Sequence, residues 1–264
     1  MTEPGKKIRF ASDLHLGMHP KEKSRERERA VTEWLDEIKN DTSQLWLVGD
    51  IFDYWFEYRR VVPRGFIRFL GKLAELSDMG IEIHIFTGNH DVWYFGYLPD
   101  EIGAIIHREP VILELGSKTF LIGHGDGLTW QDKGYLFIKW MFKNRFLQWC
   151  YARIHPNGSA GFAHWWSRRS RYSKGFCTPW QGVEKEEQII FSEKISKENP
   201  DIDYFIYGHR HIPYVYTLSS GSRVFGLGDW IVNFTYGEFD GEEMKLKKRF
   251  EEKGEIVTFF AEAE

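Results

Sequence analysis

The first 90 residues alternate short apolar runs with amphipathic helical patterns, and this alternation constrains the fold more than any other feature. Apolar runs at residues 8–12, 44–49 and 81–87 are typical of buried strands. Between them, residues 22–39 and 66–76 carry apolar side chains at helical spacing, and Gly80 is suited to end the second helix. This β-α-β-α-β order predicts parallel strands joined by helical crossovers.

The rest of the chain carries mostly antiparallel signals. Strand-like pairs flank short turns at 111–115 with 119–122, 214–218 with 223–227, and 231–239 with 243–250, and a single apolar run covers 203–207. We therefore expect an α/β fold in which two mixed sheets pack together with helices outside, as a four-layer α/β/β/α sandwich.

Five short motifs bring Asp, Asn or His to the ends of these apolar runs. They are Asp13-Leu14-His15, Gly49-Asp50, Gly88-Asn89-His90-Asp91, Gly123-His124-Gly125-Asp126 and Gly208-His209-Arg210-His211. Ligands of such sheets collect beyond the carboxyl ends of the strands, so we expect these side chains to converge. A single buried histidine is more often structural than metal-binding, but five of the 10 histidines fall in the motifs. We expect His84 and His107, which lie outside them, to be structural or surface residues.

The chemistry of the motif residues indicates a pair of divalent metals. One carboxylate, such as that of Asp50, has two oxygens and can bridge two cations. Carboxylate, amide and imidazole donors together form a mixed oxygen and nitrogen set, which suits Mn, Fe or Zn better than Ca or Mg alone. Paired metals lower the pKa of a bridging water and bind phosphoryl oxygens, so the motifs indicate phosphoester hydrolysis.

An acid-free segment separates the fourth motif from the fifth. Residues 133–183 contain nine Lys or Arg and five of the 11 Trp, and no Asp or Glu. We divide the chain into a core of residues 1–132 and 199–264 and a helical basic and aromatic lid of residues 133–198. Such a lid favours an anionic ligand with a large apolar part. The alternative is a helical subdomain that packs on itself with a solvated basic face; nucleic acid is not expected, because the formal net charge is −4.

Composition and the N-terminus bear on location. No apolar h-region follows Met1, and no run approaches the roughly 18 apolar residues of a spanning helix. Cys150 and Cys177 offer neither a disulfide framework nor a metal-binding spacing. These features predict a cytoplasmic protein, with peripheral attachment to the cytoplasmic face of the inner membrane through the lid as a further expectation.

The order D-x-H, G-D, G-N-H-D, G-H, G-H-x-H resembles the calcineurin-like metallophosphoesterase superfamily over nearly the whole chain. The resemblance implies the metallophosphoesterase sandwich and assigns the metal ligands. Asp13, His15, Asp50 and His211 would hold one metal, and Asp50, Asn89, His124 and His209 the other. It also implies that His90 is the proton or hydrogen-bond donor near the leaving group and that Asp91 orients His90. Asp53, outside the motifs, is expected at the surface or at a helix cap, with a supporting place behind the metal ligands as the alternative.

A finer resemblance concerns the substrate. His124-Gly125-Asp126-Gly127-Leu128, followed by Gln131-Asp132 and Tyr135, and later Gly228-Asp229-Trp230, are similar to UDP-2,3-diacylglucosamine diphosphatases of lipid A biosynthesis. That family uses Mn²⁺ and a metal-bridging hydroxide to cleave the pyrophosphate of a UDP-linked diacyl sugar to UMP and 2,3-diacylglucosamine 1-phosphate, with the acyl chains in the lid. The resemblance implies that the substrate-binding residues are Asp132, Tyr135, Arg168, Arg171 and Lys174.

One departure keeps other functions open. The best-known branch of that family has Arg at the position of His90, and histidine can transfer a proton where arginine only donates hydrogen bonds. The alternative enzyme is a metallophosphatase or phosphodiesterase of another nucleotide or a phospholipid. A third hypothesis is a non-enzymatic module that binds anionic lipids.

Overall fold

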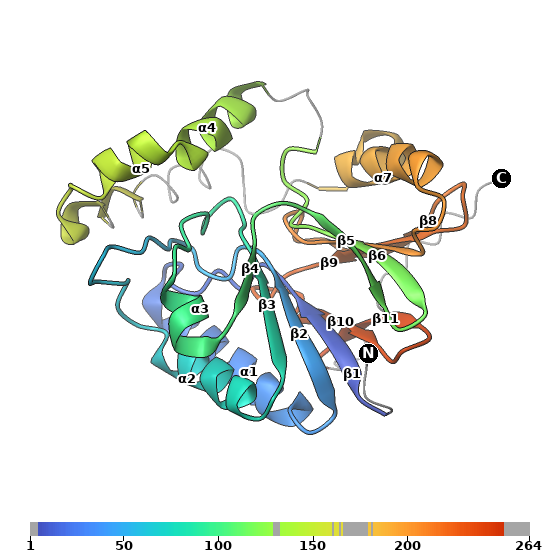
Figure 1. Cartoon of the computed structure of the whole chain (residues 1–264), viewed down its shortest axis with the longest axis horizontal. Helices are drawn as coiled ribbons and strands as arrows, with labels where there is room; N and C mark the ends of the chain where they lie inside the picture. The colour runs from blue at the N-terminus through green and yellow to red at the C-terminus, as the bar shows by residue number, and fades with distance from the viewer. Residues whose placement is uncertain are drawn as a thin grey trace.

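Two mixed sheets form the centre of the molecule (Figure 1). The computed structural model describes residues 5–128, 133–159, 161–163, 165, 179–180 and 182–250, without the side chains of Lys133 and Tyr135. The first sheet has six strands in the order β11-β10-β1-β2-β3-β4. Their bounds are β1 Lys7–Ala11, β2 Thr42–Val48, β3 Glu82–Phe86, β4 Ile105–His107, β10 Thr235–Phe239 and β11 Met244–Lys248. β1 to β4 pair in parallel, and β10 and β11 add antiparallel strands.

The second sheet has five strands in the order β5-β6-β7-β9-β8. Their bounds are β5 Val111–Leu115, β6 Lys118–Ile122, β7 Tyr204–Tyr207, β8 Pro213–Thr217 and β9 Arg223–Leu227. β6, β7 and β9 are parallel, whereas β5 and β8 pair antiparallel at the two edges. The carboxyl ends of β6 and β7 therefore lie at one edge of this sheet, as those of β1 to β3 do in the first.

Helices cover the outer faces of both sheets. Their bounds are α1 Lys21–Ile38, α2 Ile67–Asp78, α3 Tyr97–Ile102, α4 Lys133–Lys143, α5 Arg145–Tyr151, the 3₁₀ helix η1 Val183–Lys185 and α7 Glu187–Glu198. α1, α2 and α3 pack on the first sheet, and α7 packs on the second. α4 and α5 lie apart from these helices (Figure 1).

Successive side chains of a strand point to opposite faces of the sheet, and this alternation explains the layers. In β2, Leu45 and Leu47 face the helices while Trp46 and Val48 face the second sheet. In β7, Phe205 faces α7, and the neighbouring residues face the first sheet. Because β2 and β7 are apolar on both faces, each is stable only between two layers. The predicted four-layer sandwich of two mixed sheets is thus confirmed.

The predicted lid contains two kinds of helix. α4 and α5 contact the core through Tyr54, Phe56 and Trp93, which pack with Phe142 and Tyr151. By contrast, α7 is part of the second apolar layer, which favours ending the insertion before α7 rather than at residue 198. In the part of the chain that the structure describes, no helix has both the length and the apolar content needed to cross a membrane.

Candidate metal centre

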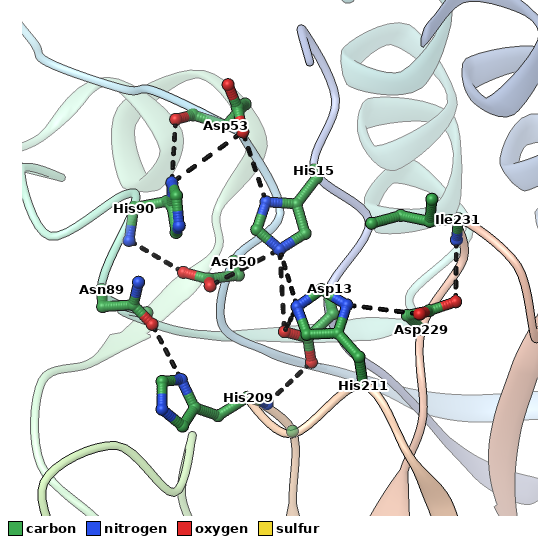
Figure 2. A network of polar contacts seen from close by, with 12 residues as sticks. Asp13, His15, Asp50, Asp53, Asn89, His90, His209, His211, Asp229 and Ile231 are labelled. Atoms are coloured by element: carbon green, nitrogen blue, oxygen red, sulfur yellow. Dashed lines mark hydrogen bonds and ion pairs between the residues drawn. The ribbon is translucent and has the colours of Figure 1, made fainter. Parts of the chain in front are cut away.

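All five motifs meet at the carboxyl ends of five parallel strands, and Figure 2 shows residues of the first, second, third and fifth motifs. Asp13 and His15 follow β1, Asp50 follows β2, and Asn89 and His90 follow β3. From the second sheet, His124 follows β6, and His209 and His211 follow β7. Since the two sheets face each other with these ends aligned, residues almost 200 positions apart become neighbours, as with His15 and His211 (|i−j| of 196).

One group of ligand atoms consists of Asp13, His15 and His211, whose side chains can offer atoms within 4.8 Å of one another. Nε2 of His15 lies 3.3 Å from Nε2 of His211, and the latter lies 3.4 Å from Oδ1 of Asp13. This buried oxygen accepts no hydrogen bond from any described residue. A carboxylate oxygen left in this state, facing two imidazole nitrogens, fits a cation between them.

The second group consists of Asp50, His124 and His209, again with ligand atoms within 4.8 Å. Nε2 of His124 lies 3.5 Å from Oδ2 of Asp50. The amide oxygen of Asn89 lies 3.3 Å from Nε2 of His124 and 2.9 Å from Nδ1 of His209. Asn89 thus adds the neutral oxygen donor that the sequence predicts for this group.

Asp50 connects the two groups. Its Oδ2 lies 3.6 Å from Nε2 of His15 in the first group and 3.5 Å from Nε2 of His124 in the second. The structure therefore brings all seven predicted ligands together, and the donor set fits two divalent metal ions that share Asp50.

Electrostatics at this site favour cations. Burial opposes ionisation of Asp50, but His124, His90 and His15 outweigh it and hold the pKa of that carboxyl well below its usual range. Likewise, burial alone would lower the pKa of His124, yet Asp50 raises it to about 10. A buried carboxylate that stabilises protonated imidazoles this strongly also stabilises divalent metals, which would take the place of the imidazole protons.

Two ligand rings are held by hydrogen bonds on their other nitrogen. Nδ1 of His124 lies 2.8 Å from the carbonyl oxygen of Val48, and Nδ1 of His211 lies 3.2 Å from Oδ2 of Asp229. The second oxygen of Asp229 accepts the backbone N–H groups of residues 231–233. Such contacts fix the tautomer and direction of a ligating ring. The sequence drew attention to Asp229 only through the finer resemblance, without a role.

The backbone at the site is unusual. Five ligand residues adopt positive φ, namely Asp13, His15, Asp50, His209 and His211. Gly49 also has a positive φ of 82°, and a Cβ there would lie 2.5 Å from Nδ1 of His124. Glycine at this position lets the chain turn directly beneath the metal-binding rings.

His90 contacts a residue that the sequence reasoning placed elsewhere. Nδ1 of His90 lies 3.2 Å from the carbonyl oxygen and 3.9 Å from Oδ1 of Asp53. The same carboxylate lies 3.5 Å from Nδ1 of His15. The expectation that Asp53 is a surface or helix-capping residue is wrong, because its side chain is buried between these two rings (Figure 2). The only signal in the sequence is its position three residues after Asp50.

Asp91 has a different partner set from the one predicted. Its carboxylate accepts the backbone N–H groups of Gly88, Asp50, Ile51 and Phe52 and the hydroxyl of Tyr94. These donors surround both oxygens, and the His90 ring is not among them. The expectation that Asp91 orients His90 is therefore corrected: Asp91 holds the loop after β2 against the loop after β3, and so places Asp50.

A cavity that opens to solvent lies beside the metal centre, between the core and α4. Asn89 and His124 line one part, and apolar side chains such as Ile138 and Phe142 line another. α4 is held over the cavity by two ion pairs: Nζ of Lys139 lies 2.7 Å from Asp126, and Nζ of Lys143 lies 2.6 Å from Glu109. Of the predicted substrate contacts, Asp132, Arg168, Arg171 and Lys174 lie outside the described residues, as does the side chain of Tyr135 in α4.

Comparison with known proteins agrees with this site. The family model for calcineurin-like phosphoesterases matches residues 6–213. The chain belongs to the calcineurin-like phosphoesterase family, a class of metal-dependent hydrolases. Within the class it is similar to the UDP-2,3-diacylglucosamine hydrolase of Porphyromonas gingivalis, with 40% identity over 91% of this chain and 97% of that protein. It is also similar to the UDP-2,3-diacylglucosamine hydrolase of Pseudomonas putida, with 26% identity over 84% of this chain and 90% of that protein.

Proposed function

We propose that this chain hydrolyses the pyrophosphate of UDP-2,3-diacylglucosamine and releases UMP and 2,3-diacylglucosamine 1-phosphate. The observation that carries the proposal is the cavity at the metal centre, since one place joins a site for phosphate, an apolar wall and basic residues of α4. The names of the two relatives support this substrate.

The seven ligands hold the cofactor in this proposal. Asp13, His15, Asp50 and His211 bind one divalent ion, and Asp50, Asn89, His124 and His209 bind the other. When bound, such a pair supplies an activated water and neutralises charge on phosphoryl oxygens. The mixed oxygen and nitrogen donor set suits Mn²⁺, Fe or Zn, and the resemblance to the diphosphatase family favours Mn²⁺. Activity of the metal-depleted protein after addition of each ion distinguishes them.

His90 donates a hydrogen bond or a proton near the leaving group, and Asp53 orients it. Asp53 beside Nδ1 keeps one proton on that nitrogen and turns Nε2 away from the Asp53 loop, so His90 donates from Nε2 when the ring carries a second proton there. Asp91 acts only through the position of Asp50. The residues Asp132, Tyr135, Arg168, Arg171 and Lys174 remain the proposed contacts for sugar and phosphate, within a lid that begins at residue 133.

The lid also supplies the proposed membrane contact. Its outer surface carries exposed aromatic pairs one helical turn apart, Phe137 with Trp140 and Phe146 with Trp149. Arg153 lies over the ring of Trp149, 4.6 Å from its centroid. Exposed Trp and Phe beside Lys and Arg are typical of helices that lie at a bilayer surface. These contacts support the proposed peripheral location on the cytoplasmic face of the inner membrane.

The test is a substrate panel with Mn²⁺. We expect UMP release from UDP-2,3-diacylglucosamine and a much slower reaction with the deacylated UDP sugar, because the apolar wall then has no partner. Fast hydrolysis of simple phosphomonoesters without UMP release from the diacyl substrate would overturn the proposal. That outcome would favour the second candidate, a metallophosphatase or phosphodiesterase of another nucleotide or phospholipid, which the proton-donating His90 can also serve.

A further inference from the structure

A second acid-free basic segment lies outside the lid, in the loop between β2 and α2 and in the first turns of α2. Residues 58–74 contain four arginines and one lysine, and no Asp or Glu. Arg59, Arg60, Arg64 and Arg68 all have exposed side chains. We call residues 58–68 the arginine loop.

The arginine side chains of this loop are exposed, and the backbone N–H of Arg68 donates to the carboxylate of Glu28. None of the four forms an ion pair within 4.0 Å with an acidic residue of the described chain. The nearest acid in sequence, Glu57, is buried and binds the backbone N–H groups of residues 95–97 instead. The loop therefore presents uncompensated positive charge to solvent.

Exposed aliphatic side chains lie among these charges. Ile67 is 77% exposed and Val61 is 51% exposed. α2 begins at Ile67, and its first turn has no acidic residue. A basic residue there is disfavoured by the helix dipole, so local helix stability does not explain Arg68. Aliphatic groups between arginines suit a surface with negative charge above hydrocarbon.

The arginine loop adjoins the lid rather than standing alone. Tyr58, its first residue, hydrogen-bonds through its hydroxyl to Ser159, and the neighbouring Phe56 ring lies 4.8 Å from that of Tyr151. The backbone N–H of Tyr58 also donates to the carbonyl of Val61, which closes the turn. Figure 1 shows the loop between β2 and α2 on the side of the molecule where α5 lies.

We propose that the arginine loop is a docking surface of the core for an anionic lipid bilayer, where its arginines contact lipid phosphates and Ile67 and Val61 enter the headgroup region. A nucleic acid would use the charges but leave the aliphatic side chains unexplained. The inference rests on the proposed function, because a lipid-linked substrate explains why the protein would bind a bilayer. Binding to a bilayer itself requires no catalysis.

The test is co-sedimentation of the full chain with phosphatidylcholine vesicles that contain or lack phosphatidylglycerol. We expect binding only to the anionic vesicles, weaker at higher salt. The variant Arg59→Gln/Arg60→Gln/Arg64→Gln should bind about 10- to 100-fold more weakly. The matched control Lys185→Gln/Lys194→Gln/Lys197→Gln removes three charges from η1 and α7 on the other outer layer and should bind as the parent does.

A second variant separates charge from insertion. Ile67→Ser/Val61→Ser keeps every arginine and should weaken binding to vesicles. Its retention on heparin, an anionic polymer without hydrocarbon, should be unchanged. Equal binding of the arginine variant and the parent to anionic vesicles would overturn the inference, as would a parent that binds heparin but no vesicle. Hydrolysis of detergent-dispersed substrate should be unchanged in the arginine variant. A parent that binds vesicles but does not release UMP would instead contradict the proposed function alone.

Discussion

The loops at the strand ends and the described part of the lid are built in opposite ways. At the strand ends, Asp13, Asp50 and Asp91 are almost completely buried, and hydrogen bonds hold the backbone around them. In the lid, α5 has no buried residue, and contact with the core depends on a few aromatic rings and ion pairs. The difference indicates a reaction centre with one geometry beside a cover that can adapt to a flexible ligand.

The strongest way to break the rigid region is to remove the shared ligand. Asp50→Ala takes a carboxylate from both metal-binding groups, and we expect activity to fall by about 10³-fold or more. Metal content, measured on the purified variant, should fall in parallel. A variant that keeps both its metals and its rate would contradict the shared-ligand geometry.

We expect a smaller loss of activity when all metal ligands are kept and only a contact that supports them is removed. Asp53→Asn keeps the size of the side chain but weakens its hold on His90 and His15. We expect kcat to fall by about 10- to 100-fold while KM changes little. Asp41→Asn, an exchange of the same type far from the site, is the control. An unchanged kcat in Asp53→Asn would return Asp53 to a structural role.

For the lid, loss of the ion pairs should change substrate affinity rather than the chemical step. Lys139→Met/Lys143→Met removes both of these ion pairs between α4 and the core and keeps the length of the side chains. Because partly exposed ion pairs contribute little, we expect KM to rise about 2- to 5-fold at nearly constant kcat. Lys194→Met on α7 is the control, and a fall in kcat as large as that of Asp53→Asn would make the lid part of the reaction centre.

Acid should lower the stability of the core through His107 in β4, the strand at one edge of the first sheet. Burial, and then the charge of His84, lower the pKa of His107 from 6.5 to about 4. The unfolded chain therefore binds more protons between these values, so the free energy of unfolding falls as the pH drops through that window. His107→Phe keeps the stacked ring against Phe86 and should show a weaker pH dependence in urea unfolding. The same slope in parent and variant would mean that other groups cause it.

The sequence predicted what periodicity and strand-end motifs encode, and missed what depends on contacts between distant segments. The runs at 111–115 and 223–227 match β5 and β9 residue for residue. The predicted strand at 231–239 begins only at Thr235, because Asp229 binds the backbone of residues 231–233 in a turn that supports His211. α3 and β4 escaped notice because they have only six and three residues.

The same division holds at the metal centre. The strand-end motifs and the family resemblance predicted seven ligands, and the structure brings these seven side chains together. The roles of Asp53 and Asp91 could not be read in this way, because each depends on which of two adjacent loops its carboxylate meets. Hydrogen bonds between loops produce no periodic pattern of residues in the sequence.

The positive φ angles of five ligand residues limit how this centre could be transplanted. A designer who copied only Asp, Asn and His onto the strand ends of another sheet would place them on backbone that sends their side chains elsewhere. The left-handed backbone turns, with Gly49 between strand and ligand, are needed to direct these side chains toward one another. Engineering of such centres should therefore graft whole strand-to-loop segments rather than single side chains.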